Sequence, residues 1–361
     1  MYTFEEKICI LFGQIGVTAK KFYTLLEYFG TPKAIADNIS DEFAQKTLGN
    51  DWEKVTKALN VGYVEEIIEK MRVNGICAVT CFSDAFPLSL ENISDPPYVL
   101  FCKGDVGLLS SRCLAVVGTR KASVYGRRVA KDFVKVLSDY FTIVSGLAYG
   151  IDSVAHETTV ECEGKTIAVL GGGIIDVYPS SNQALADKIV SSGGLILTEY
   201  GLDATPNSYH FPHRNRIVSG FSDGILVCQA PLKSGTMSTI ELALEQGKDV
   251  FVVPGEVYDP GYQGSNRLIK TMQAACVTSP RDIVDYYRLD NVETTPTVYQ
   301  PNFDEQKIIN SLSEGQKSFD QLIVETKLSL SDLNFLLANL ELKSIIARLP
   351  GNCYRLYGGI E

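Results

Sequence analysis

Residues 114–146, LAVVGTRKASVYGRRVAKDFVKVLSDYFTIVSG, decide the fold. They contain a short apolar run, a glycine-containing loop, a helical pattern and a second apolar run. Four similar runs follow along the chain, with helical patterns such as STIELALEQ between them: KTIAVLGGG, GGLILTEY, DGILVCQA and KDVFVVPG. Apolar strands that alternate with helices are buried on both faces. The pattern therefore predicts an α/β fold with an open parallel sheet built from βαβ units.

The loops after these strands are suited to bind a ligand. Every strand ends at glycine or a polar turn, which lets a ligand approach the backbone closely. The first loop carries Arg120 and Lys121 and opens a helix. Residues 112–139 hold seven basic and two acidic side chains, a local charge of +5 in a chain of net charge −10. Part of this charge could belong to a solvated helix face, but Arg120 and Lys121 lie in the loop itself.

Two later loops add cations to the same edge. FPHRNRIVSG supplies Arg214 and Arg216, and APLKSGTMST supplies Lys233 beside glycine and small hydroxyls, a pattern typical of an anion site. With aromatic side chains such as Phe211, these cations fit several backbone phosphates and unpaired bases better than one small nucleotide. The alternative, in which the two arginines only pair with acidic side chains, stays open.

Two glycine-rich loops complete this edge, SGLAYGIDSVAH (145–156) and GGGIIDVYPSSN (171–182). Three adjacent glycines are a weak signal for a phosphate cradle. We expect Asp152 to cap a helix, His156 to pack or orient its neighbours, and Asp176 to fix its loop rather than act as a catalyst.

Length and composition limit the possible functions. With 361 residues, of which 45% are hydrophobic, the chain can bury two or three cores. It has no apolar stretch of the roughly 18 residues that a membrane helix needs, and MYTFEEKICI lacks the basic start of a secretory signal. We therefore expect a cytoplasmic protein without a membrane span.

CAVTC lacks the partners of a zinc site, and phosphate-loop and nucleophile signatures are absent, so no metal, cofactor or catalytic residue is expected.

By composition and periodicity the chain divides into helices in residues 1–78, the α/β sheet in 79–288, a linker in 289–302 and a winged-helix pattern in 303–361. Gly16, Gly30 and Gly75 stand where the first helices should stop. From Asn302 onward the chain has six basic and eight acidic residues, a charge of −2. A phosphate-binding role for this last part is therefore doubtful, and a protein-interaction or regulatory role is at least as plausible.

Six motifs in fixed order resemble those of the DNA-processing protein A family (DprA, also called Smf): VGTRKASVYG, SGLAYGID..AH, AVLGGGIIDVYP..N, FPHRNRIVSG, KSGTMST and VPG........GSN.LI. The resemblance covers about residues 80–285. It implies an extended Rossmann-like parallel sheet flanked by an N-terminal helical SAM-like domain and a C-terminal winged-helix domain. It also implies a homodimer, without enzymatic activity, that protects incoming single-stranded DNA and loads the recombinase RecA onto it during natural transformation.

Carried over by position, the resemblance implies a DNA-binding site formed by Arg120, Lys121, Ser145, Gly146, Gly171, Gly172, Gly173, Phe211, Arg214, Asn215, Arg216, Lys233, Ser234, Gly235, Thr236 and Asn266. The chain departs from the family pattern at Thr119, where serine is usual, and at Gln229, where an acidic residue is expected. IKTMQAAC also lacks the usual Gly-Ala. These departures lie at the rim of the pocket and at the last strand, and none removes a phosphate-binding cation.

Two enzyme classes are the alternatives. Phosphoribohydrolases that act on nucleoside monophosphates carry PGG-x-GT-x-x-E, but here Thr239 stands three residues after Thr236 and the nearest acid is Glu241. Without the glutamate, glycosidic cleavage has no evident driver. A dinucleotide-dependent oxidoreductase would need a carboxylate for the ribose after the second strand, and none is present. Single-stranded DNA binding is therefore the favoured function.

Overall fold

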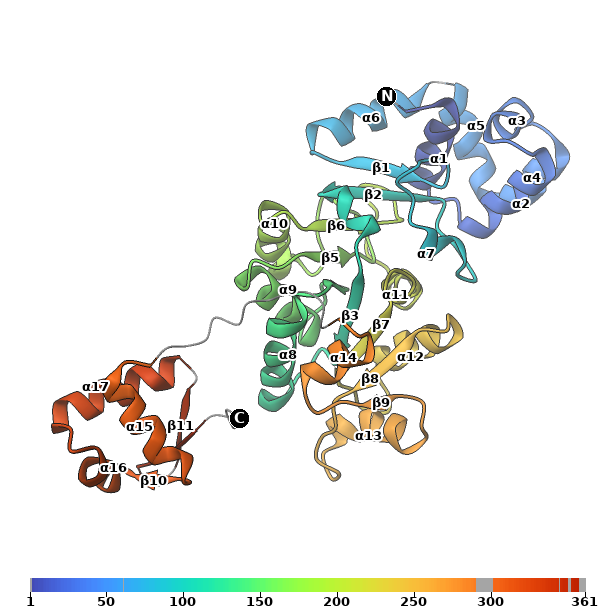
Figure 1. Ribbon diagram of the computed structural model, residues 1–361. Coiled ribbons are helices and arrows are strands. Elements are labelled where there is room, and N and C mark those ends of the chain that lie inside the picture. Colours follow the sequence, from blue (N-terminus) through green and yellow to red (C-terminus); the bar gives the residue numbers. More distant parts are fainter. Residues whose placement is uncertain (1, 61, 290–300, 344, 350–351, 357–361) are drawn as a thin grey trace. The chain divides into compact units, whose positions relative to one another are not determined.

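The computed structural model describes residues 2–60, 62–289, 301–343, 345–349 and 352–356 (Figure 1). The chain forms two compact units, Met1–Asn291 and Val292–Glu361. The predicted linker, 289–302, lies almost wholly outside the described residues.

The first unit is built around a nine-stranded sheet in the order β1-β2-β6-β5-β4-β3-β7-β8-β9. Its strands are β1 Cys77–Thr80, β2 Val99–Gly104, β3 Cys113–Gly118, β4 Thr142–Ser145, β5 Thr166–Val169, β6 Leu195–Thr198, β7 Gly224–Gln229, β8 Asp249–Val252 and β9 Ala275–Cys276. The seven strands from β3 to β9 are parallel, and β1 and β2 add to the β6 edge in antiparallel pairing. The predicted parallel sheet is confirmed, and the two antiparallel strands extend it.

The direction in which the sheet grows reverses at β3. The chain first places β4, β5 and β6 on one side of β3, and it then returns to place β7, β8 and β9 on the other side. Each half forms parallel pairs, so the carboxyl ends of β3 and β7 lie side by side at one edge. In doubly wound sheets the crevice outside the carboxyl ends at such a switch point is the usual ligand site.

Helices cover both faces of the sheet (Figure 1). One face carries α8 Val124–Leu137, α9 Ile151–Glu161, α10 Gln183–Ser191 and α14 Pro280–Tyr286, and the other α7 Leu88–Glu91, α11 His210–Phe221, α12 Gly235–Glu245 and α13 Gln263–Lys270. Alternate residues of β3 face opposite sides, as the strand period of two requires. Val116 belongs to the same hydrophobic cluster as Phe133 of α8, whereas Ala115 belongs to the cluster on the other face, with Ile217 of α11 and Ile240 of α12.

The N-terminal region consists of helices, as predicted: α1 Phe4–Ile15, α2 Ala19–Phe29, α3 Pro32–Asp37, α4 Glu42–Leu48, α5 Trp52–Asn60 and α6 Tyr63–Val73. Gly16 and Gly30 end the first two of them at positive φ, which glycine adopts without steric cost. These helices share one hydrophobic core with the β2 edge of the sheet, where Phe22 stacks on Tyr98 at 4.1 Å between ring centroids. The boundary between residues 78 and 79 stays a prediction.

The second unit has the winged-helix arrangement that its sequence pattern indicated. Its helices are α15 Phe303–Ser313, α16 Phe319–Thr326 and α17 Leu330–Leu342, and its strands are β10 Lys317–Ser318, β11 Ile346–Leu349 and β12 Cys353–Leu356. The hairpin of β11 and β12 pairs with the short strand β10 in a three-stranded sheet. Leu312, Leu322, Leu333 and Ile346 lie in its core.

Among the described residues, no helix is both long enough and apolar enough to cross a membrane.

Candidate nucleic-acid interface

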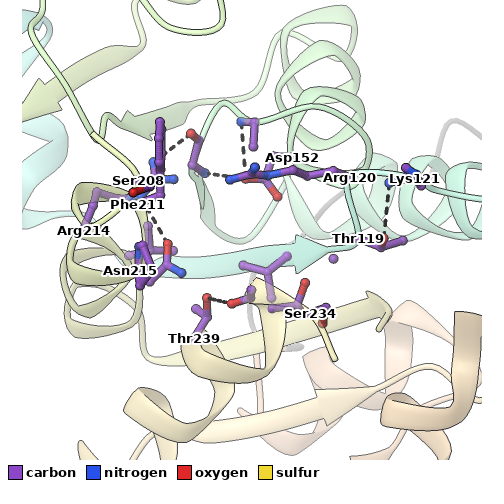
Figure 2. Close-up of a pocket in the computed structure, with 18 of the residues that line it drawn as sticks. Thr119, Arg120, Lys121, Asp152, Ser208, Phe211, Arg214, Asn215, Ser234 and Thr239 are labelled. Atoms are coloured by element: carbon purple, nitrogen blue, oxygen red, sulfur yellow. Dashed lines mark hydrogen bonds between the residues drawn. The ribbon is translucent and has the colours of Figure 1, made fainter. Parts of the chain in front are cut away.

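A pocket of about 750 Å³ lies at the carboxyl ends of β3 and β7. Figure 2 shows side chains from the loop after β3, the start of α9, the start of α11 and the start of α12 around it. Its volume is in the range of ligand-binding clefts. The pocket therefore lies at the switch point where the strand order predicts a ligand.

The loop after β3 forms the first wall and is tied to β7. Thr119 donates its backbone N–H to the Gln229 carbonyl at 2.8 Å, and the Gln229 side chain accepts the Ser123 N–H at 2.9 Å. A Cβ at Gly118 would lie 2.5 Å from the Ile151 side chain, so only glycine fits there without a shift. Gln229 stands where the family pattern has an acidic residue, and its side-chain oxygen still accepts a hydrogen bond that holds the loop. Arg120 and Lys121 are exposed on this fixed loop.

An aromatic side chain faces the first cation. The Arg120 guanidinium lies 5.5 Å from the centroid of the Phe211 ring, a cation–π contact. Phe211 is half-buried against the Tyr178 ring, with 5.6 Å between centroids. Tyr178 is exposed and also lines the pocket. These rings offer flat apolar surfaces beside a positive charge.

The start of α12 forms the second wall. Ser234 occupies the N-cap position, yet it makes no capping hydrogen bond, and its buried Oγ has no partner among the described residues. Lys233 is exposed beside it and forms no ion pair within the described part of the chain. A helix start with free N–H groups attracts anions, and a neighbouring lysine strengthens that attraction. This wall is therefore suited to a phosphate oxygen.

Arg214 forms part of the pocket floor and is held by the backbone. Its guanidinium is buried and donates to the carbonyls of Gly146, at 2.7 Å, and of Val169. Burial lowers the pKa of Arg214 to about 10, although the Asp152 carboxylate opposes this shift. Burial also shifts the pKa of Asp152, which it raises, and the positive charge of Arg214 opposes this rise. Arg214 thus shapes the floor, with part of its charge already engaged.

Asp152 does not cap α9, contrary to our expectation. The N-cap residue is Gly150, and the Asp152 carboxylate accepts the N–H groups of Gly146 at 3.2 Å and of Ala148 at 3.4 Å. The side chain thus fixes the loop before the helix. His156 is buried and bonds through Nδ1 to the Thr166 hydroxyl at 2.7 Å, as expected of an orienting residue.

The structure places Arg216 outside the pocket, in a partly buried ion-pair cluster. Its guanidinium binds Glu199 and lies 3.2 Å from Asp95. The side chain is 4% exposed, so it is not available to a phosphate. His213 joins the same two acids, and its hydrogen bonds to Asp95 and Glu199 raise its pKa to about 9. The sequence left open whether Arg216 binds a phosphate or pairs with acidic side chains, and in the structure it pairs with acidic side chains.

Five other predicted residues also lie outside the pocket lining: Ser145, Gly171, Gly172, Gly173 and Asn266. Ser145 is buried and donates to the Val116 carbonyl at 2.7 Å. The chain itself fills the space beside the three glycines, since added Cβ atoms would meet Phe211, Pro206 and Leu202. Asn266 holds the loop after β8 through hydrogen bonds to Gly255.

The pocket brings together the other predicted residues: Arg120, Lys121, Gly146, Phe211, Arg214, Asn215, Lys233, Ser234, Gly235 and Thr236. It also contains residues that the prediction missed, among them Ala148, Tyr178, Pro206, Ser208 and Pro231. The only sequence signals for them were their positions inside or beside the quoted motifs.

Comparison with known proteins identifies the family. The family model described as DNA recombination-mediator protein A matches residues 77–288, more than half of the chain. The chain belongs to this family. The model of the DprA winged helix domain matches residues 292–352. The family and fold predicted from the motifs are thus confirmed.

Several relatives support this assignment. The DNA processing protein DprA of Bacillus subtilis is 40% identical over 63% of this chain and 77% of its own length. Protein Smf of Escherichia coli is 36% identical over 76% of each chain. The X-ray structure of DprA from Streptococcus pneumoniae superposes with a TM-score of 0.67 at 32% identity, over 79% of this chain and 98% of that one. DNA processing protein A from Helicobacter pylori, whose structure concerns its single-stranded DNA binding mode, superposes with a TM-score of 0.54 at 30% identity, over 60% of this chain and 96% of that one.

Proposed function

We propose that this family member binds single-stranded DNA in the switch-point pocket, protects incoming DNA, and loads RecA onto it during natural transformation and homologous recombination. One observation carries the binding step: three exposed cations, Arg120, Lys121 and Lys233, surround a pocket that also contains an uncapped helix start and two aromatic rings. The cations and the helix start can bind the phosphates of a single strand, and the aromatic rings can stack on its unpaired bases. The Helicobacter pylori relative, which binds single-stranded DNA, supports the assignment.

A single strand fits the chemistry of the pocket better than duplex DNA or a free nucleotide. Phe211 and Tyr178 offer ring faces for stacking, which the bases of a duplex cannot use. The cations lie on two separate loops, so they suit successive phosphates rather than one phosphate group. The net charge of −10 also disfavours unspecific attachment to duplex DNA outside the pocket.

The hydrolase alternative has weaker support. Thr239 lines the pocket where a catalytic glutamate would stand, and the exposed Glu241 is not part of the lining. Asp152 is the carboxylate of the pocket lining, but it accepts two backbone N–H groups and faces Arg214. A role as general acid or nucleophile would require it to leave these partners. We therefore propose that the protein is not an enzyme.

The remaining parts of the proposal, a homodimer in the cytoplasm and a contact with RecA, rest on membership in the family. Analytical ultracentrifugation and a RecA filament assembly assay on DNA coated with a single-strand binding protein would test them.

Fluorescence anisotropy with a labelled oligo-dT strand tests the binding step. We expect tight binding that weakens with salt and is not displaced by unlabelled duplex. No binding at low salt would refute the proposal. A screen of nucleoside monophosphates for released base would then test the hydrolase alternative.

A further inference from the structure

We propose that the bound strand continues beyond the pocket over a second binding surface, where exposed side chains of α8 and of the loop after β8 stack on its bases. We call this surface the aromatic rim and define it as Val124, Tyr125, Val257 and Tyr258. The inference rests on the proposed function and extends its site.

The four side chains of the aromatic rim are unusually exposed. Tyr258 is 94% exposed, Val124 87%, Val257 77% and Tyr125 50%. The two segments lie next to each other, because the Tyr125 hydroxyl donates to the Pro254 carbonyl at 3.4 Å. Large apolar side chains that cluster on an exposed surface commonly mark an interaction site.

The loop that carries Tyr258 is held in place by several contacts. Asn266 donates from Nδ2 to the Gly255 carbonyl at 3.1 Å and accepts the Gly255 N–H at 3.2 Å. The Tyr262 ring packs on Gly255, where an added Cβ would lie 2.1 Å from it. Asp259 accepts the Gly261 N–H at 2.7 Å. The exposed tyrosine is therefore presented on a fixed loop, which lowers the entropic cost of binding. Asn266, which does not line the pocket, thus holds the loop that carries Tyr258.

The aromatic rim continues from the pocket. Lys121 lines the pocket and lies at the end opposite Arg214 (Figure 2), and Val124 follows it after two residues. Arg127 is exposed and lies on the same face of α8 as Val124, since residues three apart are neighbours on a helix. A strand that leaves the pocket past Lys121 would therefore reach the start of α8, where Arg127 and Tyr125 are both exposed.

The charges favour DNA as the occupant. Exposed cations flank the α8 side of the rim, while Glu256 is exposed beside Val257 in the loop. Phosphates would lie toward Lys121 and Arg127, away from Glu256, which turns the bases toward Tyr258. Alternating cations and rings are typical of surfaces that follow a single strand without reading its sequence.

The test compares two oligonucleotide lengths. A strand of about 4 nucleotides fills the pocket, whereas one of about 12 reaches the aromatic rim. We expect Tyr258→Ala to weaken binding of the long strand at least about fivefold and to leave the short strand unchanged, because stacking of one base contributes on the order of 1 kcal/mol or more. Tyr258→Phe should restore the affinity. Phe335→Ala in the winged-helix unit removes a side chain that is also exposed, 67%, and should change neither affinity.

A second readout reports stacking directly. Tryptophan fluorescence of Tyr258→Trp should be quenched by the long strand and not by the short one. Trp52, the single natural tryptophan, gives a constant background that the wild type measures.

The outcomes separate the two proposals. If Tyr258→Ala leaves the long strand unaffected while Lys233→Glu weakens it, the aromatic rim is refuted and the pocket stands. If Tyr258→Ala weakens both strands equally, the side chain acts on the pocket and the rim is also refuted. If neither variant changes affinity, the proposed function itself fails. A change in sedimentation of Tyr258→Ala with unchanged DNA binding would identify the rim as a protein contact and overturn the inference.

Discussion

Reversing the charge of Lys233 is the sharpest test of the pocket. Lys233 is exposed beside the uncapped start of α12 and has no ion-pair partner within the described residues. Lys233→Glu therefore removes the proposed phosphate contact without breaking an ion pair among the residues that the structure describes. It also places a negative charge where the helix dipole and the free N–H groups attract an anion.

The size of the effect follows from the number of free cations. If Arg120, Lys121 and Lys233 each neutralise one phosphate of a single strand, log Kd should change with log salt with a slope of about 2, since each contact contributes roughly 0.7. Removing one contact should lower the slope to about 1.4. The lost charge-assisted hydrogen bond and the new repulsion should raise Kd at least about tenfold, or about 1.4 kcal/mol.

Fluorescence anisotropy with oligo-dT at several salt concentrations measures both quantities. Lys233→Arg should retain most of the affinity. Lys54→Glu, the same charge change at an exposed residue of α5, serves as the control and should alter neither quantity. The reasoning would be refuted if Lys233→Glu kept the wild-type affinity and slope while its circular dichroism spectrum and thermal unfolding stayed normal.

Three further predictions concern stability. Arg216→Met should lower the free energy of unfolding by at most about 3–5 kcal/mol, since the buried Glu199 loses its closest cation and keeps only the partly exposed His213, and urea unfolding should show a much smaller loss for Arg216→Met combined with Glu199→Leu. His156 is buried neutral with its pKa lowered to about 3, so the unfolded chain takes up the proton first, and stability should fall as pH drops below about 6.5, by roughly 2 kcal/mol at pH 5. Unfolding of His156→Gln at both pH values should lack most of this acid loss, and an equal loss in wild type and variant would contradict the assignment. Gln229→Ala should cost about 1–3 kcal/mol because it leaves the N–H of Ser123 without its acceptor, and urea unfolding measures the loss.

The alternation of apolar runs and helical patterns was sufficient to predict the parallel sheet. The β7 sequence, GILVCQ, is buried at every position, and this continuous apolar character is what distinguishes a strand covered on both faces. The reversal of strand order at β3 could not be read from the sequence, because local patterns do not specify which strands pair. The family motifs supplied this information indirectly.

The sequence predicted which residues line the pocket where those residues directly follow a strand end, but not where a residue distant in the sequence pairs with the side chain; their DNA-binding role stays a prediction. Arg120, Lys121 and Lys233 follow strand ends directly, so their place at the pocket followed from the sheet. Arg216 stands in the same cationic motif as Arg214, but it is buried by Glu199 and Asp95, and no local signal connects Asp95 with α11. The glycines at 171–173 were expected to admit DNA, yet the segment 202–211 of the same chain occupies that space.

The pairing of β3 with β7 also sets the order in which the binding site comes into existence. Leu114 pairs with Gly224, so the two walls of the pocket come from parts of the chain that leave the ribosome at different times. The strands β4, β5 and β6 pair on one side of β3 and precede β7 in the chain, whereas the second wall with Lys233 follows β7. An unfinished chain would display Arg120 and Lys121 on a loop that lacks its Gln229 anchor. The two walls therefore come together only when the sheet is nearly complete, and a chain that ends before β7 lacks the pocket.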